Sequence, residues 1–548
     1  MKKVLFIALF LPLIVIGQII RPDSTSINFG NVMVGDTDSV QIVLSNTSSS
    51  AVNVNNVKFY STYSEMPFTS SDTSFTIIAN GTKNIWVYFS PIQNILHNST
   101  MVIQHSATSG HEPIALIGQG KFPLTYYNST ENLSEQALKT ALKTRLAFGY
   151  TSFSYNAARD HMFMTIDNKR FNGQGATVNT LECVYTGYNK LSYTSRSNAQ
   201  STSPQFNTEH TFPQGFFNSA SPMRTDIHHL YPTTNNSNSQ RGSKAFGVVT
   251  NGTAVTLGGG SFYTSSTFEP RNVQKGATAR AMMYFVLRYQ DYSNHFSSQE
   301  TILRSWHNAY PVTSVDTARN NAIASLQNNR NPFIDYPQLE KRITNFVINS
   351  VAPSRFTLDV LQTAVDFGSF IAQQADTFDY VLVNTGNQVI NFTSFALSST
   401  SVFSFATGSG TNTSLNPGDA LQISIVANTQ MTGTFNENLT FSTNLIFPFN
   451  NFTIPVRGSS IITSIDENNL ESQLSVFPNP FQNKVTVRTS DDRQLNIQLF
   501  DALGKETNVN LVSNHKGDMI LSTEQLARGV YFLEIRRGTE KLVKKLIK

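Results

Sequence analysis

A pair of matching segments, one on each side of the middle of the chain, constrains the fold more than any other feature. Phe29 precedes Asn46 by the same number of residues as Phe367 precedes Asn384, with glycine after each Phe and threonine after each Asn. Around both pairs, short runs of alternating apolar and polar residues are separated by Asn, Ser, Gly and Thr. Such alternation with frequent turns is typical of antiparallel strands in a β-sandwich. The repeat therefore predicts two β-sandwiches with a different domain between them.

The length and the single cysteine narrow the class of protein further. A chain of 548 residues is too long for one hydrophobic core, and an apolar content of 39% is enough for several. The formal net charge of +4 is too small to indicate nucleic-acid binding by itself. Cys183 is the only cysteine, which excludes a disulfide within the chain and disfavours a cysteine-ligated zinc site. It lies in a partly apolar run, so we expect its side chain to be buried.

The amino terminus predicts export from the cytoplasm. Lys2 and Lys3 precede an apolar run at residues 4–16, and Gly17 supplies a small residue where a signal peptidase would cleave. This order is typical of a signal peptide, which we place at residues 1–17. The alternative is a membrane anchor, but the apolar run is too short to span a bilayer comfortably, and no other stretch reaches that length. We therefore expect no stable membrane insertion.

Residues 207–242 bring together the residue types that phosphodiester hydrolysis needs. Glu209 and His210 are adjacent, and Asn238 and Arg241 follow on a second segment. A histidine can take a proton from water near neutral pH. Carboxylate and amide oxygens are hard ligands suited to Mg²⁺ or Ca²⁺, and arginine can hold a phosphate by two parallel bonds. A zincin protease is disfavoured because the chain has no His-Glu-x-x-His motif.

The sequence of this stretch closely resembles the endonuclease I family of secreted, non-specific nucleases. The family pattern is matched by Asn-x-Glu-His-Thr-Phe-Pro at 207–213, Asp-Ile-His-His-Leu at 226–230 and Asn-x-x-Arg at 238–241. Further downstream, Gln-Asn-Asn-Arg-Asn-Pro-Phe-Ile-Asp-Tyr-Pro at 327–337 matches the family's end motif, with Asn328 in place of the usual glycine. The resemblance implies an α+β nuclease domain with a ββα-metal core.

The resemblance also assigns roles to individual residues. His210 is expected to be the general base, with Glu209 and Asn238 as ligands of Mg²⁺, for which Mn²⁺ or Ca²⁺ are alternatives. The arginine known in some family members lies on an insertion that this chain lacks, so Arg224, Arg241 or Arg280 could replace it; we assign a catalytic role to Arg241 and Arg224. Four further residues are expected to orient the metal ligands without binding the ion themselves: Asp226, His228, Glu269 and Arg280.

Local patterns predict several elements of the central domain. Residues 207–212 are expected to form a strand that runs into a loop, and 276–288 a helix. A helix is also expected after Ser134 as its N-cap, whereas 155–162 have strand character and 235–244 show little helical propensity. For Arg319 and Arg330 we favour structural pairing with Asp316 and Asp335 over contact with phosphate.

The carboxyl terminus resembles another known module. A polar, acidic linker precedes Pro-Asn-Pro at 478–480 and Gly-Val-Tyr at 529–531, and the chain ends in a lysine-rich strand. This order resembles the type A sorting domain of the type IX secretion system, a small β-sandwich. It implies that the secretion machinery is a partner and that the protein is secreted or held at the cell surface. The two repeated sandwiches resemble immunoglobulin-like β-modules of bacterial surface proteins. For these modules a role as spacer or weak adhesion module is favoured over carbohydrate or matrix binding.

Together these features predict a multidomain, secreted, divalent-metal-dependent endonuclease that cuts DNA, and RNA as well, without sequence specificity and leaves 5′-phosphates. Two alternatives stay open: a surface binding protein with an inactive nuclease-like domain, and a phosphodiesterase for another substrate. The expected division of the chain is 1–17 signal peptide, 18–122 immunoglobulin-like sandwich, 123–345 catalytic domain, 346–460 second immunoglobulin-like sandwich, 461–473 linker and 474–548 sorting domain.

Overall fold

The computed structural model of the chain describes residues 19–63, 65–107, 109–289, 293–347, 349–462, 473–489, 495–515, 518–538 and 540–548. The predicted signal peptide and most of the predicted linker lie outside these residues. Among the described residues, no helix is both long and apolar enough to cross a membrane.

The first part of the chain is a sandwich of a four-stranded and a five-stranded sheet, in the strand orders β1-β3-β7-β5 and β2-β9-β8-β4-β6. Alternating residues of the strands point into the core between the sheets, where Phe29, Phe68 and Phe89 contact one another. The strands are β1 (Ile20–Pro22), β2 (Ser26–Met33), β3 (Asp38–Asn46), β4 (Val52–Ser61), β5 (Phe68–Ser70), β6 (Phe75–Ile77), β7 (Thr82–Phe89), β8 (Leu96–His105) and β9 (Glu112–Lys121).

A second sandwich with the same strand order follows the central region. Its sheets are β18-β20-β24-β22 and β19-β26-β25-β21-β23. The strands are β18 (Leu358–Val360), β19 (Val365–Ile371), β20 (Asp376–Asn384), β21 (Ile390–Leu397), β22 (Phe403–Phe405), β23 (Thr413–Leu415), β24 (Ala420–Ala427), β25 (Gly433–Thr443) and β26 (Asn451–Ile461).

The repeated asparagine has the same physical task in both sandwiches. Asn46 Nδ2 donates to the carbonyl oxygens of Ser50 and Ile77, and Oδ1 accepts from Ser48 N. Asn384 Nδ2 donates to the carbonyl oxygens of Gln388 and Leu415, and Oδ1 accepts from Gly386 N. Each side chain thus satisfies buried backbone groups at the turn after its strand, because unpaired groups would be costly there.

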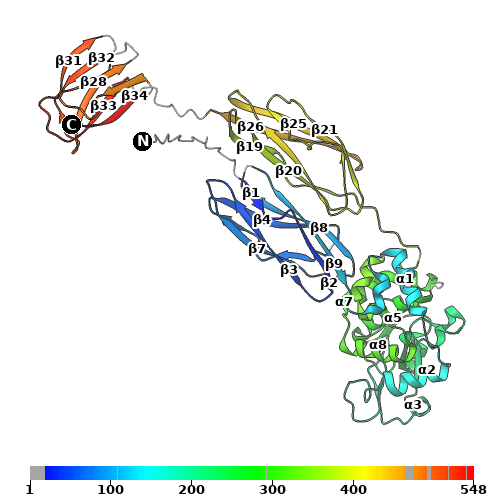
Figure 1. Ribbon diagram of the computed structural model, residues 1–548. Coiled ribbons are helices and arrows are strands. Elements are labelled where there is room, and N and C mark those ends of the chain that lie inside the picture. Colours follow the sequence, from blue (N-terminus) through cyan, green and yellow to red (C-terminus); the bar gives the residue numbers. More distant parts are fainter. Residues whose placement is uncertain are drawn as a thin grey trace. The chain divides into compact units, whose positions relative to one another are not determined.

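The two sandwiches, far apart in sequence, lie side by side (Figure 1). Tyr60 and Val102 of the first pack against Val381 and Val383 of the second. At the edge of this contact, Asn98 Nδ2 donates to Asp419 Oδ1 at 2.7 Å. The chain therefore leaves the first sandwich, forms the central region and returns to pack against its starting point.

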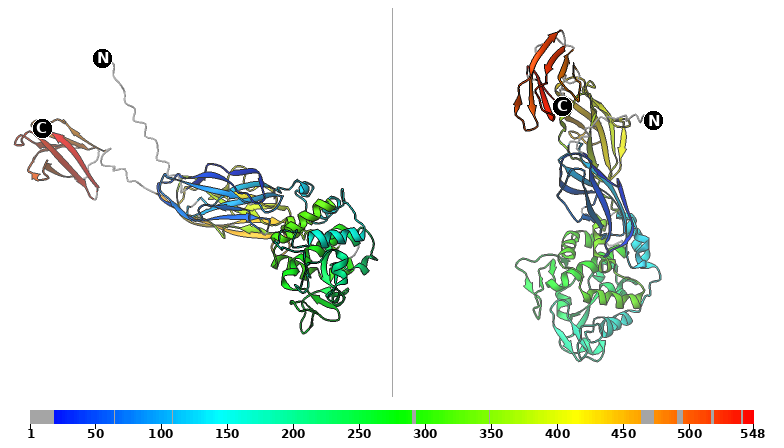
Figure 2. Two further views of the ribbon diagram at one scale, coloured as in Figure 1. Left: turned by 90° about the horizontal axis from the view of Figure 1, so that it is seen from below. Right: turned by 60° about the vertical axis from the view of Figure 1, so that its left-hand side comes forward.

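The helices are gathered in the central region, coloured cyan to green, whereas the blue, yellow and red parts are made of strands (Figure 2). Helix α5 (Asn272–Tyr289) includes the helix predicted at 276–288 and is buried along most of its length. The other α-helices are α1 (Glu135–Ala147), α2 (Tyr155–His161), α3 (Arg196–Ser201), α4 (Asn235–Arg241), α6 (Ser293–Ser297), α7 (Glu300–Ala309), α8 (Ser314–Gln327) and α9 (Pro332–Asp335).

Short strands complete the central region. The hairpin of β12 (Phe206–His210) and β13 (Leu230–Thr234) is followed directly by α4, which gives a ββα unit. Cys183 is buried and free, as predicted. The remaining strands are β10 (Thr180–Glu182), β11 (Asn189–Leu191), β14 (Ala245–Phe246), β15 (Thr253–Ala254), β16 (Phe262–Tyr263) and β17 (Thr267–Glu269).

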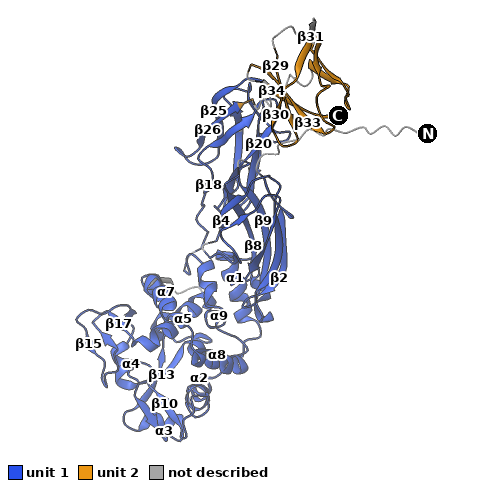
Figure 3. Cartoon of the chain, turned by 90° about the vertical axis from the view of Figure 1, so that its left-hand side faces the viewer, with its two compact units in different colours: residues 1–460 blue, residues 461–548 orange. Residues whose placement is uncertain are grey.

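Residues 461–548 form a separate compact unit, drawn in orange in Figure 3. It contains two four-stranded sheets, β27-β28-β32-β31 and β30-β29-β33-β34. The strands are β27 (Leu474–Phe477), β28 (Lys484–Thr489), β29 (Asn496–Asp501), β30 (Glu506–Thr507), β31 (Asn510–His515), β32 (Asp518–Ser522), β33 (Val530–Arg537) and β34 (Glu540–Ile547).

Three local predictions need correction. Residues 155–161 form a helix rather than a strand, because Ser154 Oγ caps the N–H of Ala157 and small alanines follow. Residues 235–241 are helical although their sequence gives little sign of it, because Thr234 caps the helix. Arg319 pairs with Asp167 rather than with Asp316.

Two further predictions can be judged from the same region. The pairing of Arg330 with Asp335 is confirmed, with Nε and Oδ2 at 2.6 Å. Helix α1 begins after Ser134 as predicted, although the serine side chain makes no capping bond.

We predict that the central region loses stability in acid. Burial lowers the pKa values of His228, His295 and His307 from 6.5 to about 4. The unfolded chain therefore binds more protons than the folded chain between pH 6.5 and 4, so the free energy of unfolding falls as the pH falls through this window, by up to about 2 kcal/mol per imidazole at about pH 5. The pKa of Glu209 is raised to about 7, so this group alone increases the free energy of unfolding as the pH falls. One such group does not cancel the effect of three histidines.

The measurement is urea unfolding followed by tryptophan fluorescence. The chain has two tryptophans, and Trp86 is 42% exposed in the first sandwich, so Trp86→Phe leaves Trp306 as the reporter of the central region. Equal or greater stability at about pH 5 than at about pH 7 would contradict the prediction.

Candidate active site

The histidine predicted as the base stands at the end of β12 with its two ring nitrogens in different surroundings. His210 Nε2 lies 3.1 Å from the carbonyl oxygen of Arg224. A carbonyl only accepts, so Nε2 carries the proton and Nδ1 keeps its lone pair. Burial, followed by the neighbouring His229, holds the pKa of His210 well below its usual range. The imidazole is therefore neutral at neutral pH and able to accept a proton at Nδ1.

Glu209 turns one carboxylate oxygen towards the protein. Oε1 accepts a hydrogen bond of 2.8 Å from Tyr185 Oη and lies 3.1 Å from Arg241 Nε. Among the residues that the structure describes, none donates a hydrogen bond to Oε2. Burial raises the pKa of Glu209 to about 7, and the Arg241 cation opposes that shift. One oxygen of the carboxylate thus remains available to another ligand.

Asn238 lies in α4, which packs against β12. Its side chain is half-buried, and its amide makes no hydrogen bond with any described residue. The hairpin and helix therefore present one carboxylate oxygen and one amide oxygen that the protein leaves unused. These hard oxygens fit Mg²⁺ or Ca²⁺, which accept a small number of protein ligands and keep several waters.

Other metal chemistry finds less support in the described ranges. They contain no group of three or more His, Cys, Asp or Glu residues that could hold an ion. A site made only of such residues, as zinc usually requires, is therefore not apparent in this part of the chain.

Arg241 is completely buried, which argues against the predicted contact with phosphate. Its Nη1 donates to the carbonyl oxygens of Gly242 and Lys244, and its Nη2 donates to the carbonyl oxygen of Thr211. With Nε beside Glu209, all three nitrogens face protein acceptors. The side chain fastens α4 to the end of β12 and supplies the positive charge beside the Glu209 carboxylate.

Arg224 has the free guanidinium that Arg241 lacks. Its Cζ lies 3.9 Å from the centre of the Tyr155 ring, and that ring is 5.9 Å from the His210 ring. Arg159 lies over the same tyrosine at 4.7 Å. Among the described residues no carboxylate pairs with Arg224, whose side chain is only partly buried. The carbonyl oxygen of Arg224 thus contacts His210, and the Arg224 guanidinium lies against Tyr155, the ring next to His210.

Sequence reasoning did not identify Tyr155 and Arg159 as part of the site. They lie one helical turn apart on α2, so a helical reading of 155–161 would have placed both on one face. In a strand, residues 155 and 159 would not be neighbours, so the strand prediction gave no reason to place Tyr155 and Arg159 together.

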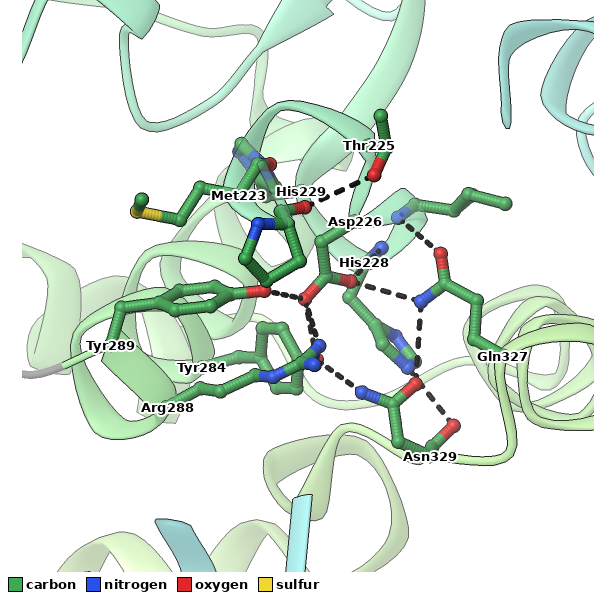
Figure 4. Close-up of polar contacts among 12 residues, drawn as sticks. Met223, Thr225, Asp226, His228, His229, Tyr284, Arg288, Tyr289, Gln327 and Asn329 are labelled. Carbon is green, nitrogen blue, oxygen red and sulfur yellow. Dashed lines mark hydrogen bonds and ion pairs between the residues drawn. The ribbon is translucent and has the colours of Figure 1, made fainter. Parts of the chain in front are cut away.

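Asp226 is the centre of a buried network (Figure 4). Its Oδ2 accepts hydrogen bonds of 2.8 Å from both Tyr284 and Tyr289 and also pairs with Arg288, while Gln327 donates to Oδ1 at 3.0 Å. The Arg288 cation holds the pKa of Asp226 well below its usual range despite the desolvation. The network touches neither His210 nor Glu209 directly.

The Asp226 network instead positions the segment that contacts His210. His228 N donates to Asp226 Oδ1, and His228 Nε2 lies 3.2 Å from Asn329 O. His229 Nε2 lies 2.6 Å from Met223 O, and the ring of His229 lies 5.5 Å from that of His210. Asp226 and His228 therefore hold the segment that contacts His210 in place and do not contact His210 or Glu209 themselves.

The structure does not bring Glu269 and Arg280 to the site. Glu269 pairs with Lys275 at 2.7 Å and accepts from Val249 N. Arg280 is buried, donates to Tyr310 O and pairs with Asp316 at 3.2 Å. Neither side chain contacts His210, Glu209 or Asn238, so both tie the frame together at other places.

Comparisons with known proteins match three parts of the chain. Residues 134–338 match the Endonuclease I family, residues 357–459 match a HYDIN/CFA65/VesB-like Ig-like domain, and residues 475–548 match a secretion system C-terminal sorting domain. These matches confirm the predicted multidomain fold.

Curated relatives cover the same central region. Extracellular ribonucleases of Bacillus amyloliquefaciens and Bacillus subtilis (strain 168) are 29% and 28% identical over 232 residues, which is 39% of this chain and 76% of each relative. An extracellular deoxyribonuclease of Aeromonas hydrophila is 30% identical over 117 residues, 21% of this chain and 50% of that protein.

We predict that Asp226→Asn destabilises the central region by roughly 3–5 kcal/mol, because it leaves the buried Arg288 cation without its counter-charge. The matched control is Tyr289→Phe, which removes one donor to Asp226 and costs about 1 kcal/mol. Urea unfolding in the Trp86→Phe background measures both. An Asp226→Asn variant as stable as Tyr289→Phe would show that the charge pair contributes little.

Proposed function

Because the chain carries an endonuclease I domain and is a secreted or cell-surface nuclease, we propose that it hydrolyses phosphodiester bonds of DNA and RNA without sequence specificity, with a divalent ion and His210 as general base. The observation that carries this proposal is the contact of His210 Nε2 with the Arg224 carbonyl, which leaves Nδ1 as a proton acceptor at the end of the strand that also carries Glu209.

The proton transfer follows from the surroundings of His210. Nδ1 takes a proton from a water molecule, and the resulting hydroxide attacks phosphorus. The bond between phosphorus and the 3′-oxygen breaks, so the products carry a 5′-phosphate and, after proton uptake from solvent, a 3′-hydroxyl. The Arg224 carbonyl oxygen stabilises the imidazolium through Nε2–H. The proton then returns to solvent.

Glu209 Oε2 and the amide oxygen of Asn238 are the groups that would hold the ion, Mg²⁺ in the first place and Mn²⁺ or Ca²⁺ as alternatives. When bound, the ion supplies charge stabilisation for the phosphate and the leaving oxygen. Arg241 offsets the negative charge of Glu209 and ties this carboxylate to α4.

Arg224 is the residue best placed to stabilise the charge that develops on the phosphate. It is the one predicted candidate whose guanidinium has no protein acceptor among the described residues, since Arg241 and Arg280 are both buried and engaged. A donor aimed at developing charge in a partly desolvated site is worth a large share of catalysis.

Substrate and partners follow from the relatives and the domains. The names of the relatives specify RNA for the Bacillus proteins and DNA for the Aeromonas protein, which supports action on both. The sorting domain supports the type IX machinery as an export partner. We also propose the boundaries 18–122, 123–345 and 346–460 for the two sandwiches and the catalytic domain between them.

The test of the proposal is digestion of plasmid DNA and of RNA, each with Mg²⁺ and with EDTA. Cleavage that needs the ion supports it. An absence of cleavage would favour an inactive binding protein, and cleavage of other phosphodiesters alone would favour the second alternative.

We predict different responses to metal within the site. His210→Ala should lower kcat by about 10²–10⁴-fold without changing the Mg²⁺ concentration that gives half the maximal rate, because the base is no ligand. Glu209→Ala and Asn238→Ala should require more Mg²⁺, and high Mg²⁺ should restore part of the rate, because each removes an oxygen ligand. The measurement is cleavage rate against Mg²⁺ concentration. Rescue of His210→Ala by metal, without rescue of the other two, would reverse the assigned roles.

We predict that Arg224→Ala lowers kcat by about 10²–10³-fold, as expected for loss of a donor to the transition state. Tyr155→Leu should lower kcat because the cation loses its aromatic support, whereas Tyr155→Phe keeps the ring and should retain most of the activity. Arg196→Ala is the control, since Arg196 already pairs with Asp160 at 2.7 Å. Equal loss in Arg196→Ala and Arg224→Ala would contradict a specific role for Arg224.

A further inference from the structure

A cavity of about 260 Å³ opens in the nuclease domain away from the three proposed site residues. Its lining includes none of Glu209, His210 and Asn238. The apolar part of the wall is formed by Ile166, Val184, Pro232, Val273, Ala277 and Val315. The other lining residues are polar or charged. An apolar wall together with converging polar groups is the usual construction of a small-molecule site.

Two buried polar side chains face this cavity without protein partners. Gln274 on α5 is 8% exposed and Tyr231 on β13 is 7% exposed, and both line the cavity. Neither the Gln274 amide nor the Tyr231 hydroxyl has a hydrogen-bond partner in the part of the chain that the structure describes, and neither is among the fully enclosed unpaired atoms, so both open into the cavity. Buried polar groups are normally paired, so a group left open on a cavity wall points to a ligand or water as the missing partner.

The charges around the cavity are already matched. Asp167 pairs with Arg319 at 2.8 Å, and Asp316 pairs with Arg280 at 3.2 Å. Glu182 pairs with both Lys169 and Arg271. No carboxylate that lines the cavity is left without a cation, so the site favours a neutral ligand over a strongly charged one.

The shape of the polar groups favours a flat ligand. The Arg319 guanidinium lies over the Tyr231 ring at 4.2 Å, and both flat groups belong to side chains that line the cavity. The Gln274 amide offers one donor group and one acceptor side by side, and the Tyr231 hydroxyl can donate or accept. Paired donors and acceptors beside flat groups and an apolar wall are what the edge and the face of a nucleobase require. The volume is slightly below the roughly 300–1,000 Å³ of sites for drug-sized ligands, which suits one nucleoside.

We propose that this cavity binds a nucleoside unit, with the base edge hydrogen-bonded to Gln274 and Tyr231. The choice of ligand rests on the proposed function, because a nuclease meets nucleoside units both in its substrate strand and in its 5′-phosphorylated products. Tyr231 is the register partner of Glu209 on the β12–β13 hairpin, so the cavity and the proposed metal ligands share one rigid element.

The test is calorimetric titration of adenosine, guanosine, cytidine and uridine into the full chain in EDTA, where no cleavage is needed. At least one nucleoside should bind with a Kd of about 1 mM or tighter. Gln274→Leu and Tyr231→Phe should each weaken that binding by about tenfold or more, and His210→Ala should leave it unchanged. Gln136→Leu, at a half-buried position of α1 that does not line the cavity, is the matched control for an amide-to-leucine change.

Several results would overturn the proposal. One is the absence of binding for all four nucleosides at several millimolar, and another is unchanged binding in both cavity variants. Binding of ribose 5-phosphate as tight as that of the nucleosides would indicate an anion site instead. Circular dichroism and thermal unfolding show whether each variant is folded, and the second variant decides if one is not.

A separate kinetic arm distinguishes the two sources of the nucleoside. If the cavity holds part of the substrate strand, Gln274→Leu should raise KM for an oligonucleotide with kcat unchanged. If it holds a free product, KM stays the same and inhibition by added nucleoside is lost. A chain that binds nucleosides but cleaves nothing would refute the proposed function and leave the cavity assignment standing.

Discussion

The hydrogen bond between His210 Nε2 and the Arg224 carbonyl oxygen depends on where the backbone of residues 223–229 lies, and a buried charge pair sets that position. Asp226 lies within this segment, and its carboxylate accepts from donors on α5 and α8. Because the Asp226 charge would be costly to bury alone, the segment is stable only where Arg288 and the tyrosines surround it. The tautomer of the base is thus fixed at a distance by residues that never touch it.

The two adjacent residues of the site experience opposite effects of the same burial. Desolvation disfavours charge, so it keeps His210 neutral and ready to accept a proton, while it pushes the pKa of Glu209 up to about 7. The Arg241 cation opposes the second shift and helps to keep the carboxylate ionised. A cation bound at Oε2 would act in the same direction. Burial and a fixed arginine together allow one hairpin to carry both a neutral base and an anionic ligand.

The sequence predicted the parts of this architecture that local pattern or matched motifs carry. The repeat predicted two sandwiches, and their sheets have the same strand order. The strand that ends at His210 was also predicted. Helix α4 was not predicted, because its Asn- and Ser-rich sequence has low helix propensity. The Thr234 cap and tertiary packing stabilise this helix instead. The partner of Arg319, Asp167, is 152 positions away, and spacing alone favoured the nearer Asp316.

The arginines show why residue type alone could not divide the roles. Arg224, Arg241 and Arg280 are equivalent in sequence as candidates for phosphate binding, and only burial separates them. Arg241 and Arg280 donate to backbone carbonyls in the interior. Arg224 follows a turn that leaves its side chain on Tyr155 and partly open. A guanidinium has five donors, so one that is fully enclosed must satisfy them within the protein and cannot be spared for a substrate.

The paired sandwiches place a further constraint on the nuclease domain. Since the first and second sandwiches pack against each other, the two ends of the central region are held close together. Arg342, at the end of that region, donates to Asn94 of the first sandwich and to the carbonyl oxygens of Thr130 and Leu133 near its start. A domain fixed at both ends loses less conformational freedom when it folds than one attached at a single end. The sandwiches can therefore stabilise the nuclease domain without contributing any residue to its chemistry.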